Sequence, residues 1–136
     1  MKKWNKKNGF TLLEIIIVVI IIGILASLAL PRFFKTVEFS RANEALAGLS
    51  AIRRAMERCY LFKNQYNSCT TFADLDVEDP GGLTNAHFSY AISAPTAANF
   101  TITATRLSLD GGTTTDTIKI GDTGTKVGTG NFSGIK

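Results

Sequence analysis

The sequence predicts an α+β fold, in which one long N-terminal helix packs against a small antiparallel sheet. Two observations support this prediction. An apolar run over 10–30 leads into an amphipathic helical pattern that continues to about residue 63. Short segments that alternate between apolar and polar residues then follow, separated by turn residues. The length of 136 residues allows one domain plus a membrane segment or a tail.

The apolar run at 10–30 contains 21 residues, and Glu14 is its only charged residue. As a helix it would be about 31 Å long, close to the roughly 30 Å hydrocarbon core of a bilayer. Four lysines within residues 1–9 precede it, and the positive-inside rule places that end in the cytoplasm. Without these four, 11 of the 15 basic residues remain against 11 acidic ones. The net charge of +4 therefore does not indicate a nucleic-acid surface.

The helical pattern becomes amphipathic in the second half of the predicted helix. Apolar residues at spacings of three and four form one stripe: Ala42, Ala45, Leu46, Leu49, Ile52, Met56 and Cys59. Basic residues lie mostly on the other side: Arg53, Arg54, Arg58 and Lys63. We interpret these basic residues as a solvated helix face in preference to a DNA-binding stripe.

Three segments after residue 63 read as strands, at 88–93, 100–105 and 117–120. The turn signals between them include Asp79-Pro80-Gly81-Gly82 and Asp110-Gly111-Gly112. The tail at 121–136 is rich in glycine and reads as a loop with one short edge strand around 131–133. An antiparallel sheet on the apolar helix stripe follows from this order.

Two ordinary explanations of the apolar run leave features unexplained. A secretory signal peptide has an apolar region of about 7–15 residues, shorter than this run. A plain membrane anchor explains the length and the lysines but not Glu14, since a carboxylate at a membrane helix centre costs roughly 2.5–3.5 kcal/mol.

The junction Gly9-Phe10-Thr11-Leu12-Leu13-Glu14 resembles the processing site of type IV pilins and prepilin-like proteins. A short lysine-rich leader ends in Gly9, an aromatic residue follows, and a glutamate is the fifth residue after the junction. Gly23 in the middle of the run and Pro31 at its end also stand where that family has them. The resemblance covers about the first quarter of the chain.

The resemblance implies a division into a removable leader (1–9), a hydrophobic helix (10–30), and an amphipathic helix half with a β head (31–136). It implies that a membrane peptidase cuts after Gly9 and that the same kind of enzyme methylates the new amine of Phe10. The product would be a structural, non-enzymatic subunit that polymerises with copies of itself, driven by an inner-membrane assembly platform and motor. Before assembly it would cross the inner membrane once, with a cytoplasmic N-terminus, and afterwards it would be part of an extracellular filament.

The resemblance is compatible with two kinds of assembly. One is a type IV pilus, used in adhesion, motility or DNA uptake, and the other is the pseudopilus of a type II secretion or competence machine. An enzyme or ligand-binding domain on a membrane anchor is a third alternative, which would need a pocket of convergent polar groups.

Glu14 has a physical role in such an assembly. Among packed apolar helices an unpaired carboxylate is costly, so the most favourable partner for Glu14 of one subunit is the Phe10 amine of a neighbour. An ion pair within one chain is the alternative, although local pairs on helices contribute only a few tenths of a kcal/mol. Gly23 and Pro31 both weaken a helix, so the stretch between them is expected to bend or melt during assembly. Close helix packing is the other explanation of Gly23.

The remaining candidate sites are few. Cys59 and Cys69 are expected to pair as a disulfide in an exported domain, which would tie the helix end to the following loop. His87 has no second ligand near it in sequence, so no zinc site is expected. Two acidic sets invite a calcium site but read as solvated loops: Asp74, Asp76, Glu78 and Asp79, and Asp110, Asp116 and Asp122. We therefore expect no metal, no cofactor, no catalytic residues and no nucleic-acid partner.

Overall fold

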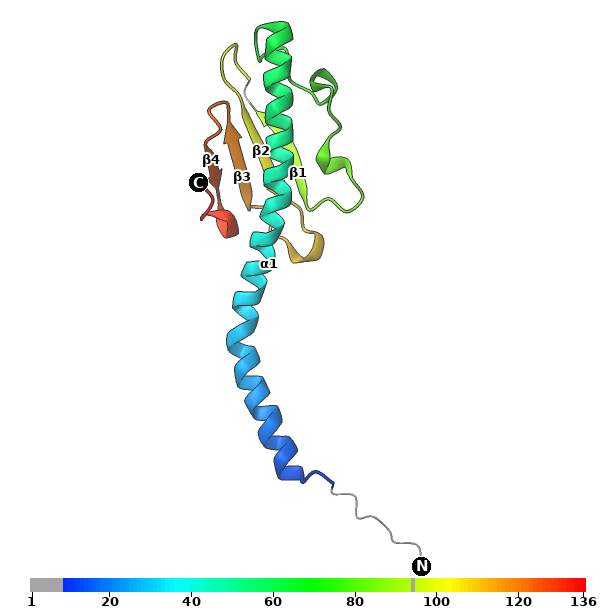
Figure 1. Cartoon of the computed structure of the whole chain (residues 1–136), viewed down its shortest axis with the longest axis vertical. Coiled ribbons are helices and arrows are strands. Elements are labelled where there is room, and N and C mark those ends of the chain that lie inside the picture. Colours follow the sequence, from blue (N-terminus) through cyan, green and yellow to red (C-terminus); the bar gives the residue numbers. More distant parts are fainter. Residues whose placement is uncertain (1–8, 94) are drawn as a thin grey trace, which may run out of the picture. The chain divides into compact units, whose positions relative to one another are not determined.

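The structure is a computed structural model, and it describes residues 9–93 and 95–136 (Figure 1). The predicted leader, apart from Gly9, lies outside the described residues. The chain forms two compact units, whose described parts are 9–35 and 36–136, and we call the second the head. The helices are α1 (Leu12–Lys63) and four 3₁₀ turns, η1 (Ala73–Leu75), η2 (Pro80–Gly82), η3 (Leu109–Gly111) and η4 (Gly130–Phe132). The strands are β1 (Phe88–Ser93), β2 (Thr101–Arg106), β3 (Thr117–Gly121) and β4 (Lys126–Gly128).

Local capping sets both ends of α1. The helix begins at Leu12, two residues later than predicted, because the Thr11 hydroxyl accepts a hydrogen bond from the Glu14 backbone N–H at 3.2 Å. It ends at Lys63 as predicted. Asn64 follows in the left-handed region with φ 54°, and its N–H donates to the Tyr60 carbonyl at 2.7 Å.

The head buries the predicted apolar stripe of α1. Its buried members are Ala42, Ala45, Gly48, Leu49, Ile52, Ala55, Met56 and Cys59. Gly48 and Ala55 were not predicted, and Leu46 is only partly buried. Small residues in the stripe let the sheet approach the helix closely, since a Cβ at Gly48 would overlap the Tyr90 hydroxyl.

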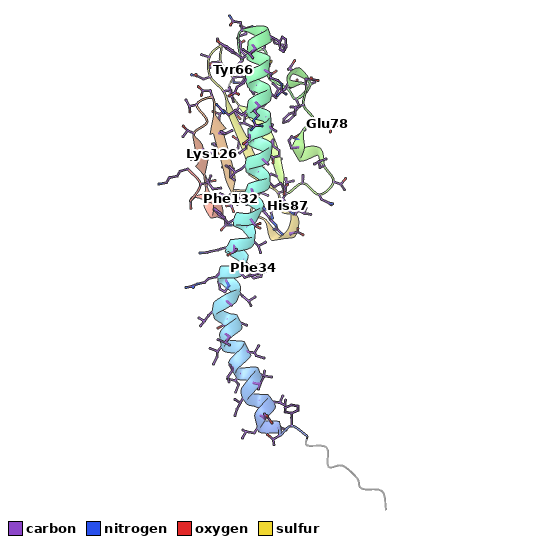
Figure 2. All side chains as sticks on the ribbon, viewed as in Figure 1. Phe34, Tyr66, Glu78, His87, Lys126 and Phe132 are labelled. Carbon is purple, nitrogen blue, oxygen red and sulfur yellow. A yellow bond between two sulfur atoms is a disulfide. The ribbon has the colours of Figure 1, made fainter. Side chains whose placement is uncertain are left out.

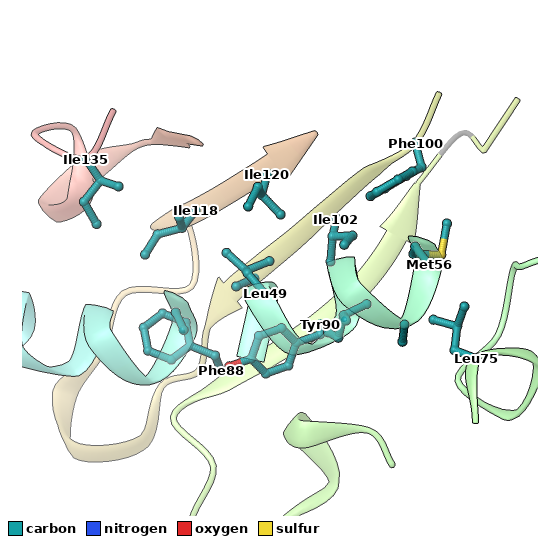
Figure 3. Close-up of a cluster of buried hydrophobic side chains, with 14 of the residues drawn as sticks. Leu49, Met56, Leu75, Phe88, Tyr90, Phe100, Ile102, Ile118, Ile120 and Ile135 are labelled. Carbon is teal, nitrogen blue, oxygen red and sulfur yellow. The ribbon is translucent and has the colours of Figure 1, made fainter. Parts of the chain in front are cut away.

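The sheet is an antiparallel meander in the order β1-β2-β3-β4, and the helical part of the head crosses one of its faces (Figure 1). Alternate residues of β1, β2 and β3 are buried beneath the helix, and Figure 3 shows Phe88, Ile102 and Ile118 among them. The α+β fold with one long helix and an antiparallel sheet is confirmed.

Two strand predictions need correction. The second strand is shifted by one residue from 100–105, because Arg106 rather than Phe100 pairs with the neighbouring strand. The predicted edge strand at 131–133 is wrong. A tight turn with Gly124 at φ 82° reverses the chain directly after β3, so Lys126–Gly128 pairs with β3 instead. Gly130–Phe132 forms a 3₁₀ turn that buries Phe132 in the core.

A fully buried arginine, Arg106, joins three elements of the head. Its guanidinium donates to both carboxylate oxygens of Glu38 on α1, at 3.0 and 3.2 Å. Its other donors reach the carbonyls of His87, Leu107 and Leu109, at 2.9–3.1 Å. With its donors shared among these acceptors, the buried charge is compensated, and the loop after β2 is tied to the helix.

Cys59 near the end of α1 and Cys69 in the following loop form a disulfide. Both residues are buried, and the bridge closes a loop with a sequence separation of 10 residues. In the loop-entropy model such a bridge contributes roughly 2–3 kcal/mol to stability.

We predict that Glu38 makes head stability depend on pH. Hydrogen bonds from Arg106 hold the pKa of Glu38, which lies outside the apolar segment 10–30, below its ordinary value of 4.5. The ion pair therefore stabilises the head above about pH 4.5, and this contribution is lost as pH falls through the lowered pKa. Glu38→Gln should cost about 2 kcal/mol at pH 7, and the difference from wild type should shrink in acid.

Urea unfolding of the full chain in detergent, followed by near-UV circular dichroism at several pH values, measures this difference. The matched control is Glu57→Gln, which breaks the half-exposed Arg53–Glu57 pair and should change stability by less than about 1 kcal/mol. A pH-independent effect of Glu38→Gln would contradict the prediction.

Candidate assembly site

The predicted cleavage junction lies outside the helix. Gly9 and Phe10 precede the Thr11 cap, and both are exposed, Phe10 by 79%. Backbone that is not hydrogen-bonded into a helix can enter a peptidase cleft in extended form. The cap thus separates the predicted cleavage junction from the helix that follows.

Glu14 occupies the first turn of α1 and is exposed. Its backbone N–H is bonded to Thr11, while its carboxylate makes no hydrogen bond or ion pair with any residue from 9 to 93 or from 95 to 136. A negative charge is favoured at a helix N-terminus by about 0.3–1 kcal/mol. That preference explains why the position tolerates a carboxylate but leaves the carboxylate open to an external partner.

The apolar segment after Glu14 is exposed along its length. Fifteen large apolar side chains from Phe10 to Leu30 are at least 46% exposed, and Figure 2 shows side chains projecting all round this part of the ribbon. The described chain has one helix long and apolar enough to cross a membrane. Fully burying a Leu, Ile or Val side chain contributes about 1.5–3 kcal/mol, so this surface strongly favours lipid or other apolar helices over water.

Two helix-weakening residues lie within this unit, and α1 is continuous through both. Pro31 has no N–H, so the Ser27 carbonyl loses its usual helical donor. The Ser27 hydroxyl itself is satisfied, because it donates to the Ile24 carbonyl at 2.7 Å. A Cβ at Gly23 would meet nothing within 4 Å, so nothing inside the chain requires glycine there.

The threonine cap is a site feature that we did not predict. Thr11 and Glu14 have the spacing of a capping box, in which a threonine accepts from the N–H of a glutamate three residues later. This spacing was visible in the sequence, and it would have placed the helix start correctly.

Asp110 and Asp116, two of the acidic residues considered for calcium, have separate partners. Asp110 bonds His87 and Arg41 at 3.2 and 3.3 Å, whereas Asp116 accepts from the Asn131 amide at 2.7 Å. The described residues contain no group of three or more His, Cys, Asp or Glu side chains placed to hold a metal ion.

His87 has partners that are distant in sequence. One ring nitrogen lies 2.8 Å from Glu44 on α1, and the other lies 3.2 Å from Asp110 after β2. These carboxylates flank the ring on two sides rather than converging on one point. No local pattern indicates this arrangement, because Glu44 and Asp110 are 43 and 23 residues away from His87 in the chain.

A capped and exposed apolar helix, followed by a helix-on-meander head, defines a type IV pilin-like protein. Residues 4–30 match the family described as "Prokaryotic N-terminal methylation motif". Residues 31–117, more than half of the chain, match the family described as "Type IV minor pilin ComP, DNA uptake sequence receptor". The chain belongs to this minor pilin family.

Curated relatives include both pilins and secretion proteins. The type IV major pilin protein PilA of Myxococcus xanthus is 41% identical over 68 residues, which are 49% of this chain and 31% of the relative. The type II secretion system core protein G of Escherichia coli is 34% identical over 80 residues, which are 59% of this chain and 55% of the relative. The matched segments thus span 31% and 55% of these relatives' lengths.

A solved structure supports the fold. The crystal structure of the Neisseria meningitidis non-core minor pilin PilV matches with a TM-score of 0.52 and 21% identity, covering 67% of this chain and 85% of that one. The family and the fold are those of structural subunits rather than enzymes.

We predict that Gly23→Ala leaves the chain itself intact but reduces assembly. Alanine fits at this position and favours the helix by about 1 kcal/mol over glycine. Helix content in detergent should therefore be unchanged or higher, while fewer fibres form, because assembly needs either bending or close helix packing here. Circular dichroism and fibre counts by electron microscopy measure the two effects. Ile22→Leu is the neighbouring control, and a normal fibre count for Gly23→Ala would exclude both roles.

Proposed function

We propose that this chain is a structural subunit of a type IV pilus, cleaved after Gly9, N-methylated at Phe10 and polymerised through α1. The observation that carries the proposal is the uncovered apolar helix, which has an unpaired carboxylate one turn from the cleavage junction. Its apolar surface needs a membrane or other helices, and its carboxylate needs a cation.

Before assembly, the apolar helix is a membrane anchor. We propose a single crossing of the inner membrane with a cytoplasmic N-terminus, supported by the lysines that precede the helix. The partner at this stage is a prepilin peptidase, which cuts the exposed junction after Gly9 and methylates Phe10. The matched methylation motif supports this step.

After cleavage, the helix leaves the lipid bilayer and packs against the same helix of other subunits. The Phe10 amine becomes a cation at the end of an apolar helix, and Glu14 supplies the matching anion. Pairing between neighbouring subunits penalises any axial shift that separates the two charges, since breaking a buried ion pair costs on the order of 3–5 kcal/mol. An assembly platform and motor in the inner membrane would supply the subunits, and the product would be an extracellular homopolymer.

The second candidate is a pseudopilus of a type II secretion machine, favoured by the similarity to core protein G of Escherichia coli. Deletion separates the candidates, because loss of surface fibres indicates a pilus and loss of secretion with fibres intact indicates a pseudopilus.

Among pilus roles, the description of the matched family favours DNA uptake. The charge of the head does not add to this, since residues 36–136 carry nine basic and ten acidic side chains. A transformation assay with the deletion strain tests this role without assuming which subunit touches DNA.

We predict that Glu14→Ala blocks assembly without blocking processing. The variant keeps the Gly9–Phe10 junction and the Thr11 cap, so N-terminal sequencing should still find chains that begin at Phe10. Loss of the carboxylate leaves the Phe10 amine unpaired among apolar helices, so electron microscopy should show few or no fibres.

Glu14→Asp is the matched control, because it keeps the charge and should retain more fibres than Glu14→Ala. Normal fibres from Glu14→Ala would exclude the register role, and uncleaved Glu14→Ala would show that the residue serves the peptidase instead.

A further inference from the structure

The head presents a basic and apolar helix face on the side of α1 away from the sheet. Ala55, Met56 and Cys59 are buried against the sheet, which directs Arg54 and Arg58 outward. These arginines are four residues apart, so they lie on one helix face. The same face continues to the exposed end of the helix, where Leu61 and Phe62 are 81% and 89% exposed.

The two outward arginines are unpaired, unlike the other arginines of the head. Arg106 is held by Glu38, Arg41 bonds Glu38 and Asp110, and Arg53 bonds Glu57 and the Asp122 carbonyl. Arg54 and Arg58 make no hydrogen bond or ion pair within the described part of the chain. A rigid helix therefore displays two guanidinium groups whose bidentate geometry suits carboxylates.

A pair of acidic side chains projects from the loop beside the helix. Leu75 is buried and Val77 packs against the core. Asp76, which lies between them, and Glu78, which follows Val77, are exposed to solvent. Figure 2 shows Glu78 on this loop, to the side of the helix. Asp76 occupies the left-handed region with φ 52°, where it ends the η1 turn.

The acidic pair is also unpaired, although its neighbours in sequence are not. Asp74 accepts from Thr71 and pairs with Lys63 at 3.5 Å, and Asp79 caps the Gly81 N–H. Asp76 and Glu78 have no such partner among residues 9–93 and 95–136. The two arginines and the two carboxylates thus do not form ion pairs with each other within the described part of one chain.

We infer that Arg54 and Arg58 of one copy dock against Asp76 and Glu78 of another copy in the filament. Two separate patches of opposite charge make a head-to-tail contact, which propagates into an open helical assembly rather than closing a symmetric pair. The exposed Leu61 and Phe62 border the contact and are covered by it. This inference rests on the proposed filament and adds a contact between heads to the contact between apolar helices.

The same helix face is a conceivable site for DNA, but charge favours the second copy. The head carries nine basic and ten acidic side chains, which gives a phosphate backbone no general attraction. The unpaired carboxylates of another copy equal the arginines in number and are opposite in charge, whereas an extended DNA site needs a larger basic surface.

Charge reversal in the full-length chain, expressed in cells whose fibres require it, tests the contact. Arg54→Glu with Arg58→Glu and, separately, Asp76→Arg with Glu78→Arg should each lower fibre number at least about tenfold, because like charges then face each other. The combination of all four changes should restore fibres. The matched control is Lys119→Glu with Lys136→Glu, which reverses two exposed charges elsewhere on the head and should leave fibre number unchanged.

Each result decides the inference. Loss in both double variants with recovery in the fourfold variant supports it, provided that the Cys59–Cys69 bridge forms normally on a non-reducing gel. Normal fibres from either double variant, or no recovery in the fourfold variant, overturns it. Normal fibres with weaker DNA binding by the arginine variant also overturns it and assigns the face to DNA. Absence of fibres from the unchanged chain would instead contradict the proposed function.

Discussion

A long, exposed apolar helix surface is the constraint on which the rest of the structure depends. Fifteen large apolar side chains between Phe10 and Leu30 are exposed in the part of the chain that the structure describes. Such a segment is stable only in lipid or among similar helices. The proposed exchange of the first environment for the second accounts for the predicted junction before the helix, the carboxylate at its start and the helix-weakening residues within it.

The head is subject to a different constraint, because its sheet must stay packed on the helix although the apolar core between them is small. The buried stripe of α1 combines larger residues such as Leu49 and Met56 with small ones such as Gly48, and this lets Tyr90 lie close to the helix. The Arg106–Glu38 pair fastens the loop after β2 to the helix, and the Cys59–Cys69 bridge fastens the loop after the helix. The loop after β2 and the loop after α1 are thus each fastened to the helix. These two attachments hold the charged side chains on the loops in defined positions.

The parts of this fold governed by short-range patterns could be predicted from the sequence. The helix end at Lys63 and the strand at Phe88–Ser93 follow from local periodicity and turn residues. The missed features depend on contacts between distant residues or on a residue in an unusual environment. Arg106 is buried only because Glu38 lies opposite it, 68 residues earlier, and no local pattern indicates a buried arginine. The strand at Lys126–Gly128 has almost no apolar alternation and exists because the turn at Gly124 returns the chain along β3.

We propose that maturation leaves the first turn of α1 unchanged. Thr11 lies after the predicted cleavage junction and caps α1 through the Glu14 backbone N–H. Cleavage after Gly9 would keep this cap, and it would exchange the lysines before Gly9 for a single terminal cation close to Glu14. The precursor and the mature subunit would then differ mainly in the charge beside the first turn of the helix.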